Sequence, residues 1–179
     1  MLVSPVSMFA RTWFPGWRKG VGHVLSLANV LLHPRSRGKV SLRSADPRAK
    51  PRIQLNLLQA EADREGLRNI VKFVRRFFGT APSSELVAAE LKPGPAVQSD
   101  AEIDAWVRAS VRTAMHPTSS CAMGTDPMAV VDGQLRVHGL SGLRIADASI
   151  MPDIVGGNTN APTIMIAEKA VDLILGRAG

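Results

Sequence analysis

Two short segments of the sequence hold side chains that could do chemistry. Residues 115–124, MHPTSSCAMG, place His116 at the head of small, polar residues that end in a glycine. Residues 155–162, VGGNTNAP, hold two glycines before Asn158 and lead into a helix-like stretch. Those glycines allow close approach of the backbone to a ligand, and a helix N-terminus suits negative charge. Against this, a lone histidine is more often structural, and the second segment is also compatible with a plain helix cap.

Several common catalytic patterns are absent from the sequence. It contains no G-x-x-x-x-G-K-[ST] phosphate loop, no H-E-x-x-H zinc pair and no G-x-S-x-G nucleophile elbow. The four histidines lack ligand-like spacing, and the single Cys121 excludes an internal disulfide framework and a cysteine-built zinc cluster. Gly20 and Gly22 begin like a dinucleotide fingerprint, but Leu25 replaces its third glycine. We therefore expect no metal site.

The elements that would position these segments are predicted from periodicity. Residues 1–30 are expected to be irregular, with a short helix over 21–30. Alternation predicts a half-buried strand at 38–44 and a second short strand at 51–56. Apolar residues at helical spacing predict a helix over 61–78.

The second half of the chain shows clearer helix boundaries. Ser99 and Glu102 form a capping box, which predicts a helix that begins there. Asn160 is a plausible N-cap and Gly176 a C-terminal stop for the final helix. Between these helices, short strands are predicted at residues 130–131, 135–137 and 143–145.

Composition favours a folded chain with a basic surface. The 179 residues are 45% hydrophobic and 21% charged, which suits one domain or two small ones, and the net charge is +7. A run of basic residues between Arg35 and Arg52 is the best nucleic-acid candidate, but no aromatic residue is interleaved for base stacking. A solvated strand and loop is the favoured interpretation. The apolar stretch at 24–32 is too short to span a bilayer, and we expect a cytoplasmic protein.

Four stretches of the sequence together carry a family resemblance: residues 31–56, 116–124, 126–140 and 142–170. The most specific of them contains GLRIADAS followed by NTNAP. In these stretches the chain resembles the C-terminal part of the glucose–methanol–choline oxidoreductases, and most closely their choline-dehydrogenase-like, alcohol dehydrogenase branch.

This resemblance implies oxidation of an alcohol to a carbonyl compound, with hydride passing to N5 of FAD. In that mapping His116 is the general base and Asn158 hydrogen-bonds the developing alkoxide. The chemistry agrees, because a histidine titrates near neutral pH and a neutral amide can donate to an alkoxide.

The resemblance also implies cofactor contacts. Asp147 and Ala148 would lie along the ribityl–pyrophosphate part of FAD, and Asn160 and Thr163 near the flavin ring. One departure stands out: family members read closer to V-G-T after the His-Pro pair, whereas this chain has Thr118, Ser119 and Ser120. Serine in place of glycine restricts the backbone there and alters the expected substrate pocket.

The implied fold class is α+β. Residues 1–125 would form the substrate-binding part, an antiparallel sheet flanked by helices after an irregular N-terminal segment. Within this part, a smaller antiparallel sheet from residues 31–56 should pack against the helix over 61–78. Residues 126–179 would return to an FAD-binding α/β domain with its last strand and helix. The family holds the ADP moiety of FAD on an N-terminal G-x-G-x-x-G unit, which this sequence lacks. We therefore expect the FAD-binding half to be missing from this chain and to be required as a partner.

Other expectations concern partners. The substrate would be a small-molecule alcohol, and we expect neither a nucleic-acid partner nor a transmembrane segment. No motif identifies the electron acceptor. Membrane association through that acceptor is an alternative to a cytoplasmic location. Two competing hypotheses are a basic, non-catalytic binding module and an inert fragment that lacks the ADP-binding half.

Overall fold

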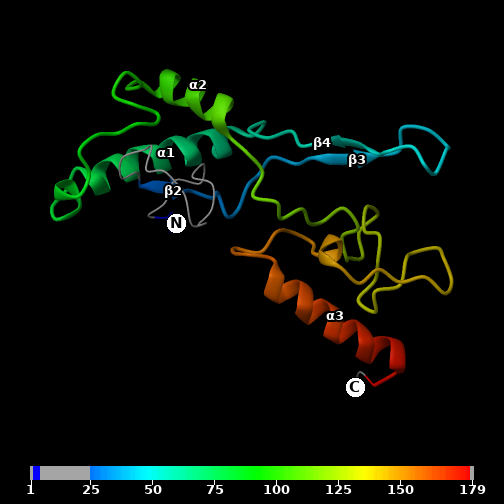
Figure 1. Cartoon of the computed structure of the whole chain (residues 1–179). Helices are drawn as coiled ribbons and strands as arrows, with labels where there is room; N and C mark the ends of the chain where they lie inside the picture. The colour runs from blue at the N-terminus through cyan, green and yellow to red at the C-terminus, as the bar shows by residue number, and fades with distance from the viewer. Residues whose placement is uncertain (1, 5–24, 178–179) are drawn as a thin grey trace, which may run out of the picture. The chain divides into compact units, whose positions relative to one another are not determined.

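The computed structural model describes residues 2–4 and 25–177 (Figure 1). These fall into two compact units, Met1–Leu31 and Leu32–Gly179. The mixture of helices with small antiparallel sheets agrees with the predicted α+β class.

The first unit is built on a short antiparallel pair. β1 (Leu2–Ser4) pairs with β2 (Ser26–Ala28), with Val3 opposite Leu27. The predicted helix over 21–30 is therefore wrong for its described part, because pairing with a distant segment outweighs a weak local helical pattern. Its first four residues, and most of the segment predicted to be irregular, lie outside the described residues.

The second unit opens with a hairpin. β3 (Lys39–Ser41) pairs antiparallel with β4 (Arg52–Gln54), which confirms the two predicted strands. A Cβ on Gly38 would lie 2.7 Å from the carbonyl oxygen of Gln54, so this approach requires glycine. The prediction that the hairpin covers the following helix is wrong: the two elements make no contact, and Val40 and Ile53 are 57% and 63% exposed.

Two helices pack together after the hairpin. α1 (Glu61–Phe78) ends at Gly79 as predicted, and α2 (Asp100–Ser110) begins with the predicted Ser99–Glu102 capping box. A short 3₁₀ helix, η1 (Ser83–Glu85), lies between them. The interface buries Leu58, Ile103 and Val107 against partly buried residues of α1.

The C-terminal part forms its own apolar core around α3 (Asn160–Leu175), which Gly176 closes in the left-handed conformation. Thr159, not the predicted Asn160, occupies the N-cap position. The predicted strands appear as isolated bridges, and η2 (Ala148–Ile150) follows them. The buried members of this core are Val131, Leu135, Ile150, Met151, Ile166 and Ala170.

Candidate functional site

The two segments singled out in the sequence meet through one hydrogen bond. His116 is half-buried in irregular backbone after α2, and its Nδ1 lies 2.8 Å from Oγ1 of Thr159. Thr159 is only 8% exposed. Asn158 directly precedes it and is exposed. The structure therefore brings His116 to the residue next to Asn158.

The backbone around His116 is anchored on the C-terminal core. The amide of Cys121 donates to the carbonyl of Ser149 at 3.0 Å, and the amide of Met123 donates to that of Ile150 at 2.8 Å. On the way, Ser119 adopts a φ of 68°, in the left-handed region that favours glycine. Ser119, where the sequence predicts a restricted backbone, therefore lies at a position where the fold requires a positive φ.

The loop that carries Asn158 is contacted by a segment far away in the sequence, residues 33–37. Nη2 of Arg37 donates to both carboxylate oxygens of Asp153, each at 3.1 Å, and the two side chains form an ion pair. The ring of His33 lies against Gly156 so closely that a Cβ there would be 2.9 Å from the His33 Cε1 atom. We call residues 33–37 the anchor segment.

A buried carboxylate in α1 holds the anchor segment. Asp63 is 3% exposed and accepts hydrogen bonds from the amides of Arg35 at 2.7 Å and Ser36 at 2.8 Å. Burial by itself raises the pKa of Asp63, but hydrogen bonds from Arg35 and Ser36 outweigh it and hold the pKa below its usual range. Asp63 therefore remains ionised at neutral pH and fixes the backbone of this segment.

The residues expected to contact a cofactor lie on the same C-terminal part. Asp147 accepts from the amide of Ser149 at 2.7 Å and caps η2, and hydrogen bonds from the side chain and the amide of Ser149 lower the pKa of Asp147. Ala148 packs against the apolar core. Asn160 is exposed at the start of α3, and Oγ1 of Thr163 donates to the carbonyl of Thr159 at 2.6 Å.

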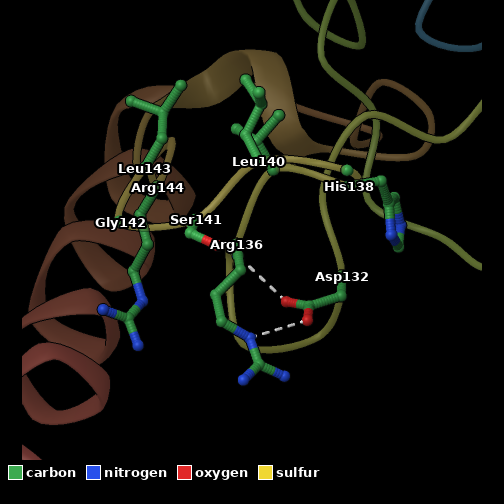
Figure 2. A pocket seen from close by; sticks show the side chains of 10 residues that line it. Asp132, Arg136, His138, Leu140, Ser141, Gly142, Leu143 and Arg144 are labelled. Carbon is green, nitrogen blue, oxygen red and sulfur yellow. Dashed lines mark hydrogen bonds and ion pairs between the residues drawn. The ribbon is translucent and has the colours of Figure 1, made fainter.

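A pocket of about 530 Å³ lies elsewhere, on the loops between residues 132 and 144 (Figure 2). Arg136 pairs with Asp132 there at 2.9 Å, while Nε of Arg144 donates to the carbonyl of Gln134. None of the predicted site residues lines this open pocket.

Two other sequence expectations concern charge and metals. In the basic run, Arg37 pairs with Asp153 and Arg48 pairs with Asp46, so these two charges are neutralised locally. Over the residues that the structure describes, no group of three or more histidine, cysteine or acidic side chains could hold a metal ion. No helix in the same ranges is long and apolar enough to cross a membrane.

Sequence reasoning missed three contributors to this site: Thr159, the anchor segment and Asp63. Thr159 carried no local signal, because its partner is 43 positions away. The anchor segment and Asp63 carried no local signal either, because their contacts also join positions far apart in the sequence.

The family model described as GMC oxidoreductase matches residues 34–167. Oxygen-dependent choline dehydrogenase of Paraburkholderia phymatum is 54% identical over 143 residues, which cover 80% of this chain and 25% of that protein. The protein of the same name from Xanthomonas campestris is 52% identical over 143 residues, with 80% and 26% covered. The chain thus spans about a quarter of the length of these curated relatives.

Solved structures give a consistent result. A formate oxidase superposes with a TM-score of 0.80 at 32% identity, covering 91% of this chain and 28% of that one. Pyridoxine 4-oxidase from Mesorbium loti superposes with a TM-score of 0.74 at 35% identity, covering 83% and 29%. The similarity extends over most of the described second unit.

Proposed function

Because this chain belongs to the GMC oxidoreductase family, whose members are FAD-dependent alcohol oxidoreductases, we propose that it is the catalytic C-terminal portion of such an enzyme. Its reaction would convert the CH–OH group of a small alcohol into a carbonyl. The observation that carries the proposal is the contact between His116 and the loop of Asn158, through Thr159. A proton acceptor and an amide donor are thereby held in neighbouring parts of one site.

In the proposed reaction, His116 takes the hydroxyl proton of the alcohol. A histidine suits this role because its pKa is ordinarily near neutrality. The Asn158 amide donates to the oxygen as negative charge develops on it. Bound FAD would supply, at N5, the acceptor for the hydride that leaves the alcohol carbon with its bonding electrons, so that loss of this hydride and of the hydroxyl proton to His116 would yield the carbonyl product.

The residues at the start of α3 fit the proposed cofactor. A Cβ on Gly157 would meet no atom within 4 Å, so the loop faces open space. The first amides of α3 have no partner within the helix, and the positive end of the helix dipole favours the negative charge of a reduced flavin. An ionised Asp147 can accept hydrogen bonds from the hydroxyls of the ribityl chain.

The proposed enzyme also needs an FAD-binding segment beside this chain. Several apolar side chains of α3 are more than half exposed, among them Ile164 at 55%, Met165 at 59% and Ile174 at 58%. Exposed apolar area of this kind favours a covering partner. We propose that residues 126–179 complete the FAD-binding domain and that residues up to 125 belong to the substrate-binding part.

The relatives' names make choline the first alcohol to assay, with oxygen or a dye as electron acceptor. We propose a cytoplasmic enzyme, with membrane association through its acceptor as the alternative.

The test is a hybrid enzyme. The matching 143 residues of the Paraburkholderia phymatum relative are replaced by those of this chain, and alcohol-dependent dye reduction is measured with FAD. We expect activity, and a loss of about 10²–10⁴-fold in kcat for His116→Ala. The variant Glu65→Gln, which changes an exposed side chain of α1, should leave the rate unchanged. Equal activity of the His116 variant would refute the assigned base, and a folded, FAD-loaded but inactive hybrid would refute the proposed function.

A further inference from the structure

Thr159 uses its hydroxyl in an unusual way for a residue that precedes a helix. A threonine at the N-cap ordinarily accepts a hydrogen bond from the amide two or three residues later. Here the side chain makes no such bond. The third helical position is Pro162, which has no N–H to offer. The hydroxyl is instead turned toward His116, with Oγ1 2.8 Å from Nδ1.

The rest of Thr159 is held rigidly. Its carbonyl accepts from both the amide of Thr163 at 3.0 Å and the hydroxyl of Thr163 at 2.6 Å. Its side chain is buried, with the whole residue 8% exposed. A hydrogen bond between the His116 ring and such a fixed group therefore constrains the orientation of the ring.

We propose that Thr159 is a positioning residue that sets the tautomer of His116. A neutral imidazole has one N–H donor and one acceptor nitrogen. With Nδ1–H donating to Oγ1 of Thr159, the lone pair lies on Nε2, which is then the atom that takes a proton from the substrate. This inference deepens the proposed function and rests on it for the identity of that substrate.

The effect of losing the Thr159 hydroxyl on kcat can be distinguished from an effect on the stability of the fold. Replacing the hydroxyl by a methyl group in Thr159→Val preserves the shape of the side chain but removes the acceptor for Nδ1–H. The ring then loses its preferred tautomer and orientation, so kcat should fall about tenfold while KM changes little. Thr159→Ser keeps the hydroxyl and should restore most of kcat.

Two measurements test the inference. The first is the ring ¹⁵N NMR spectrum of the complete chain at a pH where His116 is neutral, assigned with His116→Gln. We expect protonation of Nδ1 in the unmodified chain and in Thr159→Ser, and a shift toward protonation of Nε2 in Thr159→Val. The control is Thr80→Val, which removes a hydroxyl that donates to the Arg76 carbonyl at 2.9 Å and should leave the His116 spectrum unchanged.

The second measurement is kcat and KM of the same variants in the hybrid enzyme. A proton on Nε2 of His116 in the unmodified chain, or unchanged ring signals in Thr159→Val, would overturn the inference. An unchanged kcat for Thr159→Val in an active hybrid would do the same. If the unmodified hybrid is inactive, the proposed function fails, while the ring spectrum still decides the role of Thr159. Thermal unfolding of each variant identifies any loss of kcat that comes from a damaged fold.

Discussion

The guanidinium of Arg37 meets the carboxylate of Asp153 across 116 positions of sequence, with one nitrogen 3.1 Å from each oxygen. This pair ties the anchor segment to the start of the loop that leads to Asn158. Both side chains are more than half exposed, at 55% and 60%. Because water screens an exposed ion pair, the Arg37–Asp153 pair orients the two segments more than it adds to the free energy of unfolding.

Breaking this pair should therefore have a small effect on unfolding. We expect a double-mutant cycle with Arg37→Ala and Asp153→Ala to give a coupling free energy of about 0.2–1 kcal/mol. The coupling should shrink as salt is raised. Chemical denaturation of the four proteins at two ionic strengths measures it. A coupling free energy above about 3 kcal/mol, typical of buried pairs, would contradict the exposed geometry.

Gly156 and Gly157 form a matched pair for substitution by alanine. At Gly156 the new Cβ would lie 2.9 Å from the His33 ring, whereas at Gly157 it would meet no atom within 4 Å. We expect Gly156→Ala to displace the His33 side chain and change its NMR ring signals. Gly157→Ala should leave those signals as they are. If both variants changed the His33 spectrum equally, the close contact at Gly156 would not be its cause.

Asp63 should make the stability of the chain depend on acidity. Its pKa is lowered in the folded state, so its stabilisation is present above the unfolded value of about 3.9 and disappears as pH falls through the lower folded value. At neutral pH we expect Asp63→Asn to cost about 1–3 kcal/mol of unfolding free energy, because the amides of Arg35 and Ser36 lose a charged acceptor.

The difference in unfolding free energy between Asp63→Asn and the parent should narrow as the pH falls below the unfolded pKa of about 3.9. Denaturant unfolding at several pH values follows it. Glu65→Gln, on an exposed position of the same helix, is the control and should stay within about 0.5 kcal/mol of the parent. A free-energy difference for Asp63→Asn that widens on acidification would contradict the assigned direction of the pKa.

Ser119 is a place where glycine should stabilise the chain. Its φ of 68° costs a residue with a Cβ about 1–2 kcal/mol, and this exceeds the extra chain entropy that glycine loses on folding. We expect Ser119→Gly to raise the free energy of unfolding by about 0.5–1 kcal/mol. The neighbouring Ser120 has no positive φ, so Ser120→Gly should lower that free energy. Thermal unfolding of both variants measures the direction of each change in unfolding free energy. The prediction fails if both substitutions change it in the same direction.

Asn158 should matter for rate rather than for folding, because its side chain is exposed. In the hybrid enzyme we expect Asn158→Ala to reduce kcat by about 10²–10³-fold, the usual effect of losing one donor to a developing oxyanion. The melting temperature should stay nearly unchanged. A loss of kcat that is matched by equal loss of folded protein would point to a structural role instead.

Much of the secondary structure could be predicted from local pattern. The helical period of 61–78, the Ser99–Glu102 capping box and the glycine after the last helix each depend on neighbours within a few positions, and all three are found in the structure. The prediction of a helix over 21–30 is wrong for its described part, because a strand at Ser26–Ala28 pairs with residues near the N-terminus. The predicted packing of the hairpin on α1 is wrong for a related reason. Alternation of polar and apolar residues identifies the two faces of a strand, but it does not identify the element that covers either face.

The sequence by itself determined the two segments that contain His116 and Asn158, because their residue types and their wording are local properties. Only the tertiary structure decided that Nδ1 of His116 faces Thr159 and that Asp63 holds the anchor segment beside Gly156. The hydrogen bonds of His116, of Asp63 and of the anchor segment to these partners join residues from 27 to 116 positions apart. No local pattern encodes them, since they form when burial of the apolar faces brings distant backbone segments together.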